Sequence, residues 1–162
     1  MRHRRLPRVD LPQRTYALTC CLDRRRRLFA DPDLARALIE LWAEARDRGD
    51  IVIHAYVVMP DHYHVLMTLT GAASVTNVVR RVHSAFARTV LSRAPVDGRV
   101  WQRRFYDHAV RDDEDWRTKL SYLHDNPVRA GLVERGADYP WSSARFWETG
   151  TGPVACDGVA WQ

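Results

Sequence analysis

The sequence predicts an α+β fold: a ferredoxin-like βαββαβ antiparallel sheet with helices on one face, plus one additional helix that carries a candidate tyrosine. Two observations support this prediction. Period-two strand patterns alternate with period-3.6 helical patterns, and they follow the order strand, helix, strand, strand, helix, strand, helix. The length of 162 residues, with 46% hydrophobic and 28% charged residues, fits one domain over 1–162. We expect a basic arm over 1–12 and a mobile tail over 148–162.

The helix starts carry residues that can cap the first free backbone N–H groups. The first cap, Asp31, is followed by proline at the first helical position. The second helix is expected to start after Ser74, and the last one at the acidic run 112–115, whose charge suits a helix N-terminus. The expected strands cover residues 15–22, 51–59, 62–69 and 105–110.

Two histidines lie two residues apart on the third expected strand. Side chains of a strand alternate between faces, so His62 and His64 share one face while Tyr63 and Val65 share the other. If the apolar set fills the core beneath the helices, the histidines stand on the open face, close enough to bind one metal ion. The alternative is a pair of polar side chains on a solvated sheet face.

The last helix offers two partners for the histidine pair. Tyr122 and Asn126 are four residues apart, so they share one face of that helix. The amide oxygen of Asn126 would complete a His-His-Asn triad on a divalent ion, with Tyr122 one turn away as a nucleophile. The alternatives are a helix cap for Asn126, because it precedes Pro127, and an interfacial tyrosine with a packed ring for Tyr122.

The composition favours a nucleic-acid partner and argues against a membrane protein. The net charge is +5, and Lys119 is the one lysine among 25 basic residues. Arginine binds phosphate through a planar fork and stacks on bases, although a GC-rich coding sequence would give the same bias. The chain has neither an apolar stretch of membrane-spanning length nor the apolar core of a secretory signal at its start, so we expect a cytoplasmic protein with no membrane partner.

Four blocks of the chain resemble the REP-associated tyrosine transposases, which belong to the HUH superfamily of single-strand DNA transposases. The blocks follow the same order and similar spacing across about residues 12–147, and they cover residues 54–64, 101–107, 122–133 and 139–143. The resemblance implies His62 and His64 as metal ligands and Tyr122 as the catalytic nucleophile. It also implies a polar third ligand four residues after the tyrosine, where this sequence has Asn126. Three arginines within the matching blocks are candidate DNA-binding residues: Arg103, Arg104 and Arg129.

The activity implied by the resemblance is a metal-dependent DNA strand transfer. The enzyme would cleave and rejoin single-stranded DNA near REP-like hairpin repeats through a 5′-phosphotyrosine intermediate, with Mg²⁺ or Mn²⁺, as a monomer or a homodimer. Tyr56 on the open face would offer a ring for stacking bases. Three alternatives are a non-catalytic single-stranded nucleic-acid-binding module, a phosphodiesterase that uses water, and a domesticated family member. A binding module would not need the histidine pair, and a hydrolytic enzyme would not need Tyr122.

Overall fold

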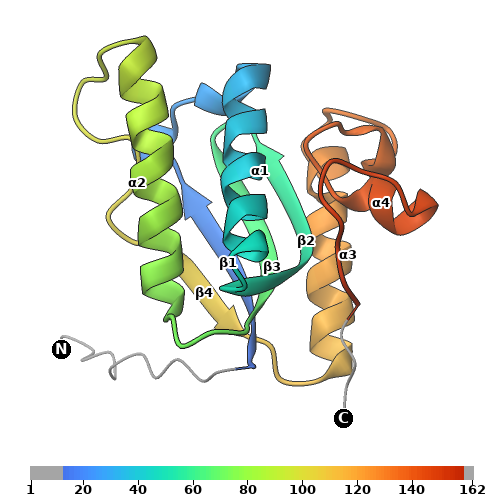
Figure 1. Cartoon of the computed structure of the whole chain (residues 1–162). Helices are drawn as coiled ribbons and strands as arrows, with labels where there is room; N and C mark the ends of the chain where they lie inside the picture. Colours follow the sequence, from blue (N-terminus) through green and yellow to red (C-terminus); the bar gives the residue numbers. More distant parts are fainter. Residues whose placement is uncertain (1–12, 159–162) are drawn as a thin grey trace, which may run out of the picture.

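The computed structural model describes residues 13–158 and confirms the predicted order of elements. Four strands form one antiparallel sheet in the order β2-β3-β1-β4, and α1 and α2 cover one of its faces (Figure 1). The elements are β1 Thr15–Cys21, α1 Pro32–Asp47, β2 Ile51–Met59, β3 His62–Leu69, α2 Val75–Arg93, β4 Tyr106–Ala109, α3 Asp113–Arg129 and α4 Ala144–Thr149. Short 3₁₀ turns cover Asp23–Arg25, Leu28–Ala30 and Gly136–Asp138.

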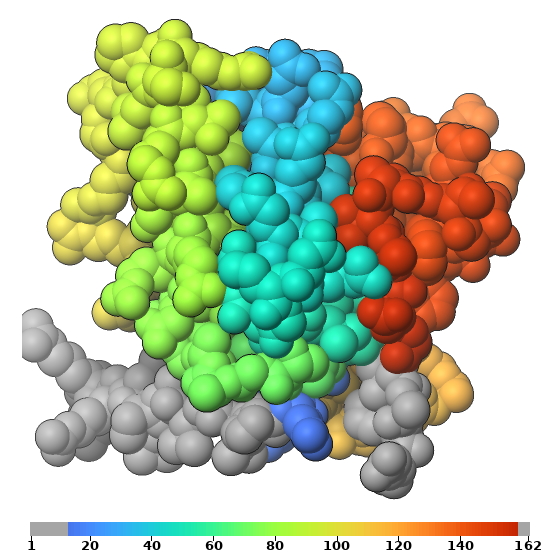
Figure 2. Space-filling model, in the orientation of Figure 1, coloured from blue at the N-terminus to red at the C-terminus, as the bar shows by residue number. Residues whose placement is uncertain are grey.

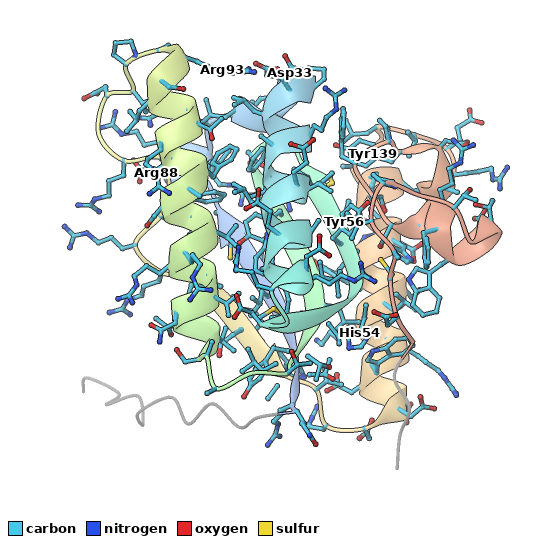
Figure 3. The ribbon with its side chains drawn as sticks, viewed as in Figure 1. Asp33, His54, Tyr56, Arg88, Arg93 and Tyr139 are labelled. Atoms are coloured by element: carbon cyan, nitrogen blue, oxygen red, sulfur yellow. The ribbon has the colours of Figure 1, made fainter. Side chains whose placement is uncertain are left out.

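The predicted caps open the three long helices. The side chains of Asp31, Ser74 and Asp112 each accept a hydrogen bond from a backbone N–H two or three residues further on. An ion pair also joins the two helices on the front face. Figure 3 shows Arg93, at the end of α2, reaching toward Asp33, at the start of α1, and their charged atoms lie 3.5 Å apart.

The main core lies between the sheet and the α1/α2 layer. The alternation predicted for β3 is confirmed there, because every second side chain of this strand is buried against the two helices. Tyr63 is the largest of them and is 1% exposed. Its neighbours in the core from the same strand are Val65, Met67 and Leu69. The strand therefore leaves its remaining side chains, His62 and His64 among them, on the opposite face.

Strand β2 changes its alternation in the middle. Its register with β3 shifts between Ile53 and Ala55, so the strand contains one extra residue, His54. After this bulge Tyr56 points into the main core and is 4% exposed (Figure 3). The prediction that Tyr56 lies on the open face is therefore wrong. The β2 residues that face away from the main core are Ala55, Val57 and Met59.

The second face of the sheet is half covered. Helix α3 packs on it through a smaller apolar cluster in which Trp116 and Leu123 of the helix join Leu66 of β3, Tyr139 and the β2 residues after the bulge. The other half of this face, along β1 and β4, borders a cleft beside α3. The additional helix thus leaves open only the part of the face that lies next to the histidine pair.

The C-terminal segment pairs with the edge strand β2. The N–H of Val58 donates to the carbonyl of Trp141 at 2.8 Å, and the N–H of Asp157 donates to the carbonyl of Ile53 at 2.9 Å. Cys156 is buried on the main core. Figure 2 shows the C-terminal segment, in red, lying against the body of the molecule. Residues 148–158 therefore differ from the expected mobile tail, whereas the basic arm over 1–12 and residues 159–162 lie outside the described residues. No helix within residues 13–158 is long and apolar enough to cross a membrane.

Candidate active site

The two histidines of β3 lie side by side on the half-open face. Their ring centroids are 4.9 Å apart and their planes are perpendicular, at 89°. His64 is buried, at 8% exposed, while His62 is nearer the solvent. The strand register places Thr19 of β1 opposite His64 and, on its other side, opposite Tyr106 of β4. The predicted position of both rings on one face agrees with the structure.

Each imidazole is held through its Nδ1 atom. The Asp61 carboxylate accepts a hydrogen bond from His62 Nδ1 at 2.6 Å, and it also lies 2.9 Å from the Arg25 guanidinium. Thr19 Oγ1 lies 2.8 Å from His64 Nδ1. Partners on Nδ1 leave the two Nε2 atoms for a ligand, which is how a histidine that binds metal is usually oriented.

The surroundings keep His64 uncharged. Burial lowers its pKa to about 3, and the electrostatic effects of His62, Arg129 and Arg25 act in the same direction. At neutral pH the ring therefore offers a free lone pair, which is the form that binds a cation.

Helix α3 brings Asn126 to the histidine pair. Its Nδ2 lies 3.3 Å from His64 Nε2 and 3.5 Å from the carbonyl oxygen of Tyr122. The helix runs through Pro127, and its C-cap is Ala130, so the interpretation of Asn126 as a cap is wrong. Pro127 is buried, and its packing offsets the backbone hydrogen bond that proline cannot make.

The residues present fit a divalent cation. A half-turn of the Asn126 amide puts its oxygen where Nδ2 now lies. With the oxygen at that place, the amide and His64 Nε2 would be 3.3 Å apart, a spacing at which both could hold one cation. Within residues 13–158, no group of three His, Cys, Asp or Glu side chains could hold a metal ion. The amide of Asn126 is the polar side chain that α3 brings within 3.3 Å of His64.

Tyr122 stands beside the same cleft with its ring accessible. Its ring centroid lies 5.8 Å from that of His64, at a perpendicular angle, and the residue is 47% exposed. The guanidinium carbon of Arg129 lies 4.1 Å from the centroid of the tyrosine ring. This exposure does not fit the alternative of a ring packed in an interface, and the hydroxyl can be reached by a bound strand.

The three candidate DNA-binding arginines lie in different places. Arg129 lies over the ring of Tyr122, and Tyr122 lines the cleft. Arg103 lines a separate groove beside α2, together with Arg80 and Arg99. Arg104 is exposed in the same connection between α2 and β4. The structure thus brings only Arg129 of this set next to the histidine pair.

Three residues of the site were missed in the sequence. Asp61 directly precedes His62, and a carboxylate beside a candidate metal ligand is a signal that was available. Thr19 reaches His64 only through the pairing of β1 with β3, which the sequence does not specify. Arg25 lies near this end of β3 because a 3₁₀ turn follows β1.

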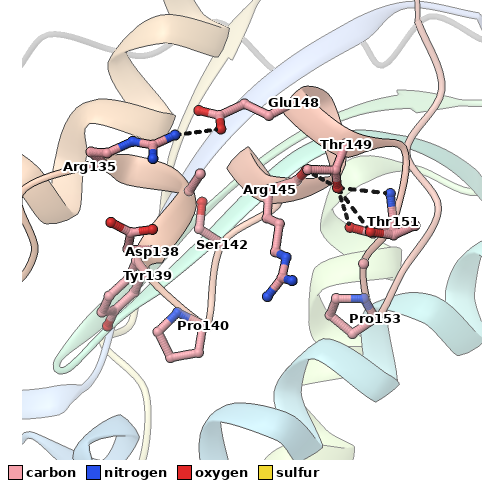
Figure 4. Close-up of a pocket in the computed structure, with 12 residues that line it drawn as sticks. Arg135, Asp138, Tyr139, Pro140, Ser142, Arg145, Glu148, Thr149, Thr151 and Pro153 are labelled. Atoms are coloured by element: carbon pink, nitrogen blue, oxygen red, sulfur yellow. Dashed lines mark hydrogen bonds and ion pairs between the residues drawn. The ribbon is translucent and has the colours of Figure 1, made fainter.

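A larger cavity than the cleft beside α3 lies elsewhere, in the C-terminal part of the chain. It has a volume of about 690 Å³ and lies between the Gly136–Asp138 turn, α4 and residues 151–153 (Figure 4). Its polar side chains bind one another: Arg135 pairs with Glu148 at 3.0 Å, and the Thr149 hydroxyl lies 2.9 Å from that of Thr151. Neither the histidine pair nor Tyr122 lines it. The smaller cleft beside α3 is therefore the candidate active site.

Comparison with protein families gives one match that covers most of the chain. The family described as "Transposase IS200 like" matches residues 11–126. A REP-associated tyrosine transposase of Escherichia coli strain K12 is 33% identical over 99 residues, which are 60% of this chain and 56% of that protein. A second curated relative, from Haemophilus influenzae, is 36% identical over 55% of this chain and 56% of its own length. The chain spans about half the length of the curated relatives it matches.

Two solved structures share the fold. A REP-associated tyrosine transposase bound to a REP hairpin aligns with a TM-score of 0.73 and 28% identity, over 95% of this chain and 91% of that one. A structure from Deinococcus radiodurans R1 aligns with a TM-score of 0.53 and 20% identity, over 75% of this chain and 95% of that one, and it shows the fold alone. The predicted ferredoxin-like α+β class is thus confirmed.

Proposed function

The chain belongs to the IS200-like transposase family, and from that premise we propose that it cleaves and rejoins single-stranded DNA, with Tyr122 as the nucleophile. The observation that carries the proposal is the meeting of His64 from β3 with Tyr122 and Asn126 from α3 in one cleft. The proposed substrate is a single strand beside a REP-like hairpin, since a relative of the same fold was solved with a REP hairpin.

The proposed cofactor is Mg²⁺ or Mn²⁺, held by Nε2 of His62, Nε2 of His64 and the amide oxygen of Asn126. A cation held there would supply positive charge to offset the charge that develops on the scissile phosphate. The role of Asp61 and Thr19 is to orient the two imidazoles through Nδ1, so that both Nε2 atoms can bind the cation. Mn²⁺ suits a site with two imidazoles, and Mg²⁺ is acceptable to it.

The chemistry at Tyr122 is an in-line displacement. The phenol oxygen forms a bond to phosphorus, the bond from phosphorus to the 3′ oxygen breaks, and that oxygen leaves as a 3′-hydroxyl. The proton of the phenol passes to water, and the guanidinium of Arg129 lies over the tyrosine ring. The 5′-phosphotyrosine link keeps the energy of the broken phosphodiester, so a second 3′-hydroxyl can reverse the reaction without ATP.

A covalent-adduct assay tests the nucleophile. The protein is incubated with labelled single-stranded hairpin DNA and Mn²⁺, and a covalent protein–DNA band is sought after denaturation. The wild-type protein and a Tyr106→Phe control should form the band, whereas Tyr122→Phe should not. A band from Tyr122→Phe would contradict the assignment. Tight DNA binding without a band under any metal condition would favour a non-catalytic binding module.

Titration with Mn²⁺ tests the ligand set. His64→Ala should abolish both metal binding and the adduct while the protein stays folded. Asp61→Ala keeps all three ligands but frees the His62 ring, so we expect Mn²⁺ affinity to fall about 10- to 100-fold. Asn126→Asp keeps an oxygen at the third position and should bind Mn²⁺, unlike Asn126→Ala. Unchanged Mn²⁺ affinity in Asn126→Ala would remove the amide from the proposed site.

A further inference from the structure

A narrow cavity continues from the histidine pair toward β4. This cavity, called here the β4–α3 slot, has a volume of about 310 Å³. Its floor is formed by β1 and β3, one wall by β4 and the other wall by α3. The side chains that the argument uses are Thr19 and His64 on the floor, Tyr106 and His108 on the β4 wall, and Lys119 and Tyr122 on the α3 wall.

The strand register fixes how the slot relates to the candidate metal site. Thr19 pairs with His64 on one side and with Tyr106 on the other, so these three side chains share one face of three neighbouring strands. Neighbouring strands are about 4.8 Å apart, which puts Tyr106 two strands from His64. Tyr106 is 57% exposed, so its ring borders the slot with room for a second ring against it. Tyr122 borders the same slot from α3.

The polar groups of the slot are unequal in charge. Lys119 lies one helical turn before Tyr122, is half-buried, and is the one lysine of the whole chain. His108 Nε2 lies 2.7 Å from the Asp115 carboxylate, which also accepts from the backbone N–H of Arg111. Asp115 is not among the residues that line the slot, and Arg111 lies 3.6 Å from its carboxylate. Within the slot, the ammonium group of Lys119 can donate to a hydrogen-bond acceptor on a ligand.

We propose that the β4–α3 slot binds one unpaired nucleobase of the strand, adjacent to the scissile phosphate. This inference rests on the proposed function. The base stacks on Tyr106, and Lys119 donates a hydrogen bond to a keto oxygen on its edge, which favours guanine or thymine. The volume lies at the lower end of the range for ligand pockets and so fits a single planar ring system. An exposed aromatic ring such as that of Tyr106 is a surface on which unpaired bases stack.

An abasic scan tests the slot without relying on catalysis. Hairpin DNA with single-stranded flanks is prepared with one abasic residue moved along each flank, and its affinity for the Tyr122→Phe protein is measured by fluorescence anisotropy. We expect one position at which loss of the base weakens binding by about tenfold, the usual effect of one stacked base. Equal affinity at every position would overturn the inference.

Three variants in the same background assign the base to the slot. Tyr106→Ala should remove the effect of the abasic residue, and Tyr106→Phe should keep it, because phenylalanine retains the ring. Lys119→Met should abolish a preference for thymine over cytosine at that position. Persistence of the base effect in Tyr106→Ala would place the base elsewhere and overturn the inference.

The two assays separate the two claims. A covalent adduct that forms with the wild-type protein, with no base effect in the scan, would contradict the slot and leave the proposed strand transfer standing. A base effect that depends on Tyr106, without an adduct under any metal condition, would support the slot and contradict the proposed strand transfer.

Discussion

Strand β3 has two unlike faces. On the side of α1 and α2, the Tyr63 ring is enclosed by Trp42 and Trp101, and its hydroxyl lies 2.9 Å from Nε2 of His83. On the other side, Asp61 and Thr19 hold His62 and His64 through their Nδ1 atoms, and His64 lines a cleft. The alternation of one strand thus assigns stability to one set of residues and chemistry to the residues between them.

The largest expected effect tests this separation directly. Tyr63→Ala empties a fully buried site and should lower the free energy of unfolding by about 3–5 kcal/mol. His62→Ala, one residue away, should lower it by less than about 1 kcal/mol, because its ring faces the cleft. Urea unfolding of both variants measures the difference. Equal losses of unfolding free energy would show that both faces of β3 contribute similarly to stability.

A glycine tests how α3 is held against the sheet. His124 of α3 lies 2.9 Å from the Ser143 hydroxyl, which also accepts from the N–H of Tyr56 on β2. A methyl group at Gly136 would lie 2.6 Å from the carbonyl oxygen of His124, too close for any carbon. Gly136→Ala should therefore cost about 1–3 kcal/mol and slow adduct formation. The control is Gly71→Ala, whose nearest contact is 3.5 Å and which we expect to be tolerated.

Lowering the pH should decrease the free energy of unfolding through His83, on the α1/α2 side of the sheet. Burial lowers the pKa of His83 to about 3, whereas an unfolded histidine titrates near 6.5. Because the folded value is the lower one, protonation favours the unfolded chain. The stability that the uncharged His83 ring contributes is fully present above pH 6.5 and is lost as the pH falls toward 3. Between pH 7 and pH 5 this histidine should cost at most about 2 kcal/mol.

Unfolding in urea at both pH values measures that loss. His83→Gln should show a smaller decrease than the wild-type protein, and the decrease that remains comes from other groups, including the cleft. If His83→Gln loses as much stability between pH 7 and pH 5 as the wild-type protein, protonation of His83 does not cause the loss.

The smallest effect compares the caps of the two layers. Ser74→Ala at α2 and Asp112→Ala at α3 should each lower the unfolding free energy by about 1 kcal/mol, since each removes one capping hydrogen bond. Thermal unfolding measures that loss. Only Asp112→Ala should also slow adduct formation, because α3 carries Tyr122. A similar rate loss in Ser74→Ala would mean that the two layers are coupled more tightly than their contacts suggest.

Much of the fold followed from local patterns. The bounds of β2 and β3 and the caps of the helices were predicted correctly, because alternation and capping depend on residues close together in the chain. The expected strand over 105–110 is shorter at both ends, as β4 covers Tyr106–Ala109. The cover on the second face was not foreseen, since it depends on where α3 and residues 139–157 dock after the sheet has formed.

In the site, too, local patterns predicted some positions correctly, and tertiary packing determined the others. The common face of His62 and His64 follows from a period of two, and it holds because β3 is regular. Tyr56 was misplaced because a bulge at His54 reverses the alternation, and no glycine marks the bulge. Asn126 before proline suggested a helix end, but the buried packing of Pro127 carries the helix one turn further. Tertiary packing decided both positions.

The single lysine has a practical consequence. Since 24 of the 25 basic residues are arginines, the chain carries one side-chain primary amine, and it lies on the wall of the β4–α3 slot. A reagent that acylates amines therefore has one side-chain target in the whole sequence. Protection of that amine by added DNA, read by mass spectrometry, would report occupancy of the slot in the unmodified protein.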